Sequence, residues 1–171
     1  MMSSIRIALT LTSLLLLGGC TYHQIASPTT YEMVAIPGFS VGGSVSLINT
    51  RTSSEDALYL SSAGRKFYGN LTQWTDTAIA IARRELEKRH ATIEPGATKS
   101  LGLAITSTRA TEGFWGFSVF TTLKVKTGDG YTKAYTGEGS SPIATRAPDA
   151  AIMESVAAMF RDQKIVDYLT Q

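Results

Sequence analysis

The sequence predicts an α+β fold in which two helices pack on one face of a mainly antiparallel sheet. Apolar residues recur every three or four positions over 67–92, which predicts a long amphipathic helix. Three alternating segments between 101 and 136, two of them joined by a Gly-Asp-Gly turn, predict an antiparallel meander. A second apolar helical stripe follows Pro148. Because the helices flank the meander instead of alternating with single strands, the order strand, helix, three-strand meander, helix is typical of the α+β class.

Composition restricts the class of protein. The 171 residues include 16 basic and 14 acidic side chains, one cysteine and two histidines, and 43% are hydrophobic. The length fits one domain, and the apolar content excludes an intrinsically disordered chain. A single cysteine excludes an internal disulfide framework and a zinc site built from cysteines. The formal charge of only +2 argues against a nucleic-acid partner, which a clustered basic excess would indicate.

Residues 1–19 have the layout of a cleaved secretory signal. Arg6 supplies the positive region, Ile7 to Leu17 form the apolar region, and two glycines follow. The apolar run is shorter than the roughly 18–20 residues that a permanent membrane span needs. We therefore expect three segments, namely the signal peptide at 1–19, an acylated cysteine with a tether at 20–40, and a single periplasmic α+β domain at 41–171.

The run Leu17-Gly18-Gly19-Cys20 resembles the bacterial lipobox, in which the cysteine becomes the first residue of the mature protein. We expect cleavage between Gly19 and Cys20, a diacylglycerol on the Cys20 thiol, an acyl chain on its amino group, and no other cofactor. A free or buried cysteine is less favoured, because an exposed thiol is a liability in an oxidising compartment. Thr21 rather than Asp follows the cysteine, and resemblance to enterobacterial sorting then favours the periplasmic face of the outer membrane over the inner membrane.

The segment before the long helix is expected to hold little regular structure. Its polar character and two prolines predict a tether from Thr21 to about Ser40, with one short strand over 32–36. β-Branched residues predict a strand at Val45–Thr52. Ala57–Leu60 fits either a second short strand or a loop that packs on the domain.

The long helix is predicted over Phe67 to Thr92, with Asn70 as its N-cap and Gln73 in the position of a capping box. Its second half carries a cluster of basic side chains, namely Arg83, Arg84, Lys88, Arg89 and His90. Such a cluster fits a binding site for phospholipid or lipopolysaccharide. A solvated helix face, partly paired with neighbouring glutamates, is the favoured interpretation.

The second half of the chain is expected to form the meander and the remaining helices. The predicted strands are Leu101–Thr106, Phe117–Lys126 and Tyr131–Thr136, with a turn at Gly128-Asp129-Gly130. A loop is expected at Gly137–Ala147, because it contains two glycines and a proline. A helix should follow from Pro148, and Asp162 should cap a final short helical turn.

Aromatic residues crowd at Phe114-Trp115-Gly116-Phe117, just before the second meander strand. The favoured interpretation is that Phe114, Trp115 and Phe117 cap the hydrophobic core. The alternative is an exposed apolar edge that docks a partner or a lipid.

The sequence does not indicate an enzyme. His90 is the only histidine beyond the tether, and it lacks the acid and nucleophile context of a hydrolase triad. Motifs for metal, phosphate-loop or dinucleotide binding are missing, and we expect no metal site. The carboxylates of Asp129 and Glu138 are the weak candidates for a glycosidase pair. Gly137-Glu138-Gly139 is interpreted as a turn.

Over residues 45–169 the chain resembles the YajG-like group of small proteobacterial lipoproteins. It is more distantly similar to the lipopolysaccharide-assembly lipoprotein and to auxiliary lipoproteins of lipid-transport ABC systems. The resemblance depends on the order of elements, namely the strand at Val45–Thr52, the helix at Asn70–Arg89, the hairpin at Leu123–Gly139 and the tail at Ala150–Leu169 with its Phe160-Arg161-Asp162 sequence. It implies an accessory or scaffolding role in the cell envelope, with no functional residue carried over except Cys20.

Three functions follow from these observations, in decreasing order of support. The first is a membrane-anchored, non-enzymatic scaffold lipoprotein that contacts an envelope protein or lipid. The second is a lipid or lipopolysaccharide-binding subunit of a transport system, which would use Arg83, Arg84, Arg89 and the Phe114–Phe117 segment. The third, an envelope hydrolase, has the least support.

Overall fold

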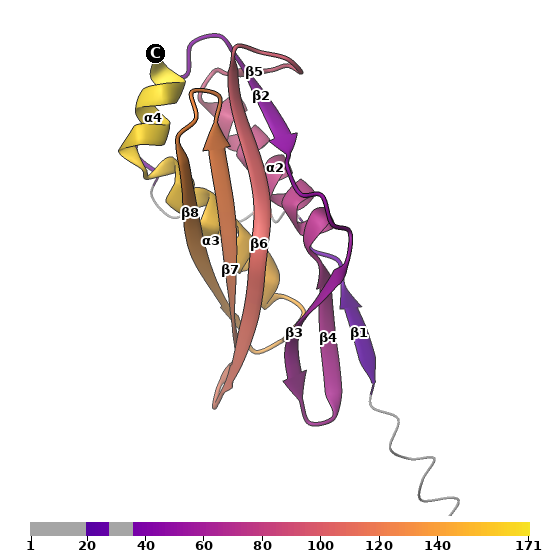
Figure 1. Ribbon diagram of the computed structural model, residues 1–171. Helices are drawn as coiled ribbons and strands as arrows, with labels where there is room; N and C mark the ends of the chain where they lie inside the picture. The colour runs from indigo at the N-terminus through magenta and orange to yellow at the C-terminus, as the bar shows by residue number, and fades with distance from the viewer. Residues whose placement is uncertain (1–19, 28–35) are drawn as a thin grey trace, which may run out of the picture.

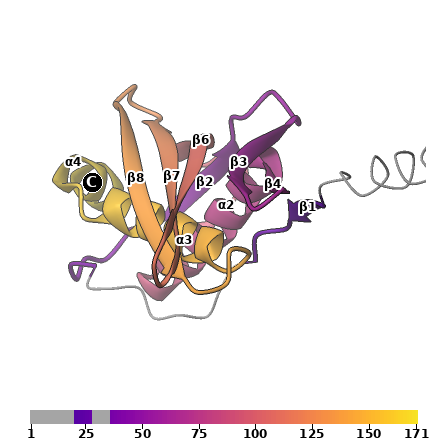
Figure 2. The ribbon, with the colours of Figure 1, turned by 90° about the horizontal axis from the view of Figure 1, so that it is seen from below.

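The computed structural model describes residues 20–27 and 36–171. Their elements, in chain order, are β1 (Thr21–Gln24), β2 (Ser44–Asn49), β3 (Asp56–Ser62), β4 (Arg65–Asn70), α2 (Leu71–Lys88), β5 (Thr92–Ile93), β6 (Lys99–Gly113), β7 (Gly116–Thr127), β8 (Thr132–Ser141), α3 (Ala147–Phe160) and α4 (Gln163–Thr170). The predicted α+β class is confirmed, since α2 and α3 cover the same face of the larger sheet (Figures 1 and 2).

The larger sheet has five strands in the order β5-β2-β6-β7-β8. The predicted meander is confirmed, because β7 pairs antiparallel with both β6 and β8. Its strands are longer than the alternation indicated, and β6 runs for 15 residues. β2 is parallel to both of its neighbours, β5 and β6. Between β2 and β6 the chain must therefore return to the end of the sheet where β2 begins, and the segment that contains α2 makes this return.

A second sheet of three strands, in the order β1-β4-β3, lies beside the first part of α2 (Figure 1). The expectation that the helix covers Phe67 is therefore wrong, since Arg65–Asn70 is the strand β4. Phe67 and Gly69 face inward there, and any Cβ on Gly69 would overlap the ring of Trp74. The predicted cap is confirmed, because the Asn70 side chain accepts a hydrogen bond from the Gln73 amide at 3.1 Å.

The first residues of the expected tether are instead part of the fold. β1 pairs in parallel with β4, from Thr21 opposite Lys66 to Gln24 opposite Gly69. The Trp74 indole donates to the Gln24 carbonyl at 3.1 Å, and the Thr77 hydroxyl donates to the Ala26 carbonyl at 3.1 Å. These bonds fix residues 21–26 against α2.

Of the predicted strand at 32–36, residues 32–35 lie outside the described part of the chain.

The core fills the space between the five-stranded sheet and the helices. It includes the fully buried side chains Trp74, Leu86, Leu101, Leu103, Ile105, Leu123, Ile152, Met159 and Phe160.

The prediction of a loop that begins at Gly137 is wrong, because β8 continues to Ser141. Gly137 and Gly139 lie directly under the backbone of α3, where a Cβ would overlap Ala151 and Ala147. The glycines therefore serve close helix–sheet packing rather than a turn.

Candidate functional site

Cys20 is exposed and stands immediately before the first strand of the domain. Its carbonyl accepts a hydrogen bond from the Lys66 amide at 2.9 Å. This bond places Cys20 beside the β3–β4 turn, where Ala63 and Gly64 adopt positive φ angles of 47° and 74°. Arg65 and Lys66 follow this turn and are exposed. The predicted lipid attachment site is thus next to two cations on a short, well-defined hairpin.

Phe114 and Trp115 form the two-residue turn between β6 and β7, and we call this pair the aromatic tip. Pairing of the two strands is continuous from Ser107 opposite Thr122 to Gly113 opposite Gly116, so the tip is the end of a hairpin that is paired up to its turn. Phe114 is 91% exposed and Trp115 is 87% exposed, with their rings edge to face at 4.9 Å. The favoured expectation of a core cap is therefore wrong for both residues, because the hairpin carries them past the helical layer. Phe117, one residue into β7, is partly buried against the core.

The aromatic tip and Cys20 lie at the same end of the molecule, which we call the Cys20 end. Figure 1 shows the β6–β7 turn, the β3–β4 turn and the start of β1 at this end, and Figure 2 views it from below. The Ser62 hydroxyl at the end of β3 donates to the Glu112 carboxylate near the end of β6. A groove of about 420 Å³ lies between the three-stranded sheet and the start of β7. It is lined among others by Tyr22, Arg65, Phe67, Phe117, Pro142 and Ile143.

Two members of the basic cluster of α2 form ion pairs within the fold. The Arg89 guanidinium donates to the Glu85 carboxylate at 2.7 Å, and it lies over the rings of Phe39 and Phe160 at 4.8 Å and 5.9 Å. Lys88 pairs with the same carboxylate at 2.8 Å. Burial by itself raises the pKa of Glu85, but the hydrogen bonds from the two cations outweigh burial and lower it. Arg89 is therefore engaged in packing and is not available to a ligand.

Arg83 and Arg84 are exposed on α2, near the end opposite to the aromatic tip. Figure 1 shows α2 running from β4 towards β5, away from the β6–β7 turn. The structure therefore does not bring these arginines together with Phe114, Trp115 and Phe117. A single lipid site built from both sets of residues has no geometric support.

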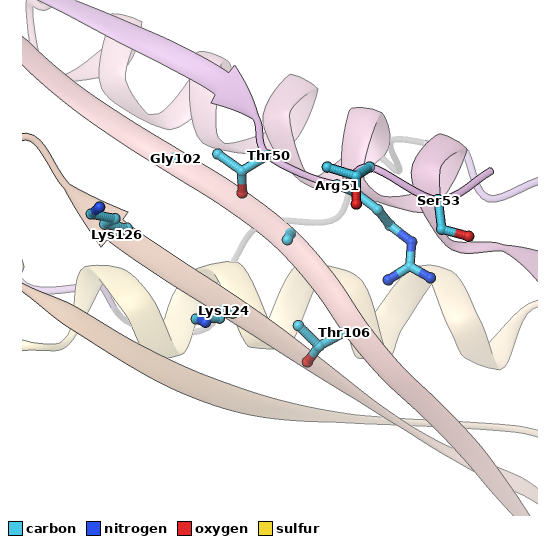
Figure 3. A pocket seen from close by; sticks show the side chains of 9 residues that line it. Thr50, Arg51, Ser53, Gly102, Thr106, Lys124 and Lys126 are labelled. Carbon is cyan, nitrogen blue, oxygen red and sulfur yellow. The ribbon is translucent and has the colours of Figure 1, made fainter. Parts of the chain in front are cut away.

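A shallow pocket of about 390 Å³ lies where the connection after β2 meets the outer face of the five-stranded sheet (Figure 3). Its lining residues are Thr50, Arg51, Thr52, Ser53, Gly102, Ala104, Thr106, Lys124 and Lys126. The Arg51 guanidinium donates to the Ile105 carbonyl at 2.9 Å, which fixes the connection to β6. The sequence did not indicate this pocket, because the strand predicted at Val45–Thr52 includes residues 50–52. That strand ends earlier, at Asn49, and the residues after it line the pocket. Its lysines suit weak contact with an anion, and its lining holds no carboxylate or imidazole for acid–base chemistry.

The three weak candidates for catalysis occupy separate places. Asp129 is in the β7–β8 turn, where hydrogen bonds from the Thr127 hydroxyl and the Tyr131 amide lower its pKa. Glu138 lies on β8, seven residues after Tyr131, and at about 3.3 Å per residue it is about 23 Å from Tyr131 along the strand. His90 follows α2 with a φ of 68°. Within residues 20–27 and 36–171, no three His, Cys, Asp or Glu side chains group as a metal site would require.

No protein-family model and no curated protein matches this chain. Among the helices of the described part of the chain, none combines the length and apolar character needed to cross a bilayer.

Proposed function

We propose that this chain is an exported bacterial lipoprotein, held by lipid on Cys20 at the periplasmic face of the outer membrane, and that its domain is a non-enzymatic accessory or scaffold component of the cell envelope. The observation that carries the proposal is the position of the only cysteine. It ends a run that resembles the lipobox, and it stands exposed one residue before the first strand.

The physical basis is the strength of a multiple lipid anchor. Each buried methylene contributes about 0.8 kcal/mol, so one acyl chain gives marginal membrane binding whereas two or more give stable anchoring. A processed lipoprotein carries three chains on its cysteine. The scaffold role is supported by the resemblance to the YajG-like group and by the separation of Asp129, Glu138 and His90 on different elements.

The test is mass spectrometry of the full-length chain expressed in a Gram-negative host and extracted from its membranes. We expect an N-terminal peptide that begins at Cys20 and carries a diacylglycerol and an N-acyl chain. The matched control is Cys20→Ser, which should accumulate unprocessed and unacylated. A processed protein with a bare thiol contradicts the proposal.

Thr21→Asp tests the sorting part of the proposal. We expect this variant to keep its acyl chains but to fractionate with the inner membrane, while the natural chain fractionates with the outer membrane. Equal distribution of both proteins would show that residue 21 does not direct sorting.

A further inference from the structure

We propose that the aromatic tip inserts into the interface of the same phospholipid bilayer that holds the acyl chains of Cys20. It is a second, non-covalent contact that holds the domain upright on the membrane. This inference rests on the proposed function for the identity of the anchor, and it adds the orientation of the domain and the residues that determine it.

The two side chains of the aromatic tip have the chemistry of a membrane interface. Phenylalanine and tryptophan each present on the order of 150–250 Å² of mainly apolar surface, and soluble domains usually bury it. Here both rings are almost fully exposed and pack side by side. Tryptophan is enriched at membrane interfaces, because its ring is apolar while its indole N–H remains in the headgroup layer.

The distance along the chain between the lipid on Cys20 and the fold is short. The Cys20 carbonyl is bonded to the Lys66 amide, and Thr21 already pairs in β1, so there is no flexible spacer in between. Acyl chains on Cys20 therefore bring the whole Cys20 end against the bilayer. The aromatic tip extends at that same end (Figure 1).

The aromatic tip is held rigidly by the rest of the domain. Gly116 has a φ of 145°, and a Cβ at this position would lie 2.5 Å from the Ser141 carbonyl, so the base of the tip fits closely against the end of β8. The hydrogen bond from Ser62 to Glu112 ties the β6–β7 hairpin to β3. Because the tip is already ordered, insertion costs little additional conformational entropy.

Positive charge at the Cys20 end also favours contact with a phospholipid surface. Arg65 and Lys66 are exposed beside Cys20, where they suit the phosphate groups of a phospholipid surface. Ile143 is half exposed in the groove that Arg65 and Phe117 also line, so apolar and basic side chains occur together at the Cys20 end. A phospholipid interface matches this combination of aromatic, aliphatic and cationic side chains.

An upright domain leaves the remaining surfaces free for partners. In this orientation the strands of the five-stranded sheet extend away from the bilayer with the outer face of the sheet turned to the side, and α4 lies at the opposite end (Figure 1). The scaffold role in the proposed function would then use these surfaces.

The experiment is tryptophan fluorescence of the acylated protein reconstituted in vesicles of phosphatidylethanolamine and phosphatidylglycerol, with and without brominated acyl chains. The chain has two tryptophans, and Trp74 is completely buried in the domain. Since only Trp115 reaches the interface, we expect bromine to reduce the emission by roughly half. Trp115→Phe should remove this quenching, because only Trp74 remains.

A matched control moves the exposed tryptophan away from the membrane. In the Trp115→Phe background, Ile48→Trp places the indole at a half-exposed position on β2. The inference expects no bromine quenching from this position. Equal quenching from positions 48 and 115 would show that the domain has no fixed orientation and would overturn the inference.

The outcomes separate the inference from the proposed function. A bare Cys20 in the mass spectrum overturns the lipoprotein assignment, and with it the anchor on which this inference rests. An acylated Cys20 with an unquenched Trp115 overturns only the insertion of the tip. A photocrosslinking amino acid at position 115 gives a further check in cells, since labelling of one protein instead of phospholipid would assign the tip to a protein partner and overturn the inference.

Discussion

The two ends of the domain differ in whether their charged or aromatic side chains have partners within the fold. At the end that carries α4, two charged side chains are bonded within the chain. Arg89 is held by Glu85 and two aromatic rings, and Asp162 accepts hydrogen bonds from Tyr131, Lys133 and Tyr135. At the Cys20 end, Phe114 and Trp115 remain exposed. A side chain whose hydrogen bonds and contacts are made inside the fold stabilises the structure. An exposed apolar pair on a rigid hairpin instead gains free energy when another surface covers it.

The largest expected effect is at Arg89. Arg89→Ala removes the ion pair with the buried Glu85. It also removes the contacts of the guanidinium with the rings of Phe39 and Phe160. Because Lys88 still pairs with Glu85, we expect a loss of about 3 kcal/mol in the free energy of unfolding, the low end for breaking a buried pair. Urea denaturation followed by circular dichroism measures it. Arg83→Ala on the same helix is the control and should change stability by less than about 0.5 kcal/mol.

The next effect is at Asp162, the N-cap of α4, whose side chain also accepts from the Lys164 amide at 2.9 Å. Burial by itself raises the pKa of this carboxyl, but its hydrogen bonds outweigh burial and lower the pKa to about 2. At neutral pH we expect Asp162→Asn to lower the free energy of unfolding by about 2 kcal/mol, because charge-assisted hydrogen bonds are lost.

This effect should depend on pH with a defined sign. Since the pKa of Asp162 is lower in the folded chain than its ordinary value of 3.8, its contribution is complete above that value and is lost as the pH falls towards about 2. The stability difference between Asp162→Asn and the natural chain should therefore shrink over this window. Denaturation at pH 6, 4 and 2.5 measures it, with Glu138→Gln as an exposed control. A difference that stays constant contradicts the role given to the carboxylate.

A smaller effect is expected where the tip joins the sheet. Gly116→Ala introduces a Cβ against the Ser141 carbonyl and forces an alanine into a φ of 145°. We expect a loss of about 1–2 kcal/mol, in the range for local backbone strain. Gly42→Ala, which has open space and an ordinary backbone, is the matched control. An unchanged melting temperature in Gly116→Ala would mean that the hairpin end is not held rigidly.

The smallest effect on stability is expected at the aromatic tip itself. Phe114→Ala and Trp115→Ala remove rings that bury almost nothing in the domain, so each should change the free energy of unfolding by less than about 0.5 kcal/mol. The same denaturation assay measures it. A loss of more than about 2 kcal/mol would instead show that the rings pack into the core, as the sequence alone favoured.

Local sequence signals determined much of the fold. The alternation of apolar residues and the Gly-Asp-Gly turn were sufficient to predict the β6–β7–β8 meander, and Asn70 and Asp162 were found as helix caps. Such features are encoded by neighbours in sequence, since side-chain period and capping depend on residues a few positions apart. The position of Cys20 after the signal-like run is likewise a property of the sequence alone.

Tertiary structure decided what depends on partners far apart in the chain. β1 forms because Thr21–Gln24 meets β4 more than 40 residues later, and no local pattern encodes that parallel pairing. Arg89 is structural because Phe39 and Phe160 converge on it from distant segments. Phe114 and Trp115 are exposed because the paired hairpin extends past the helices, and hydrophobicity in a sequence does not specify which apolar residues the other layer will cover.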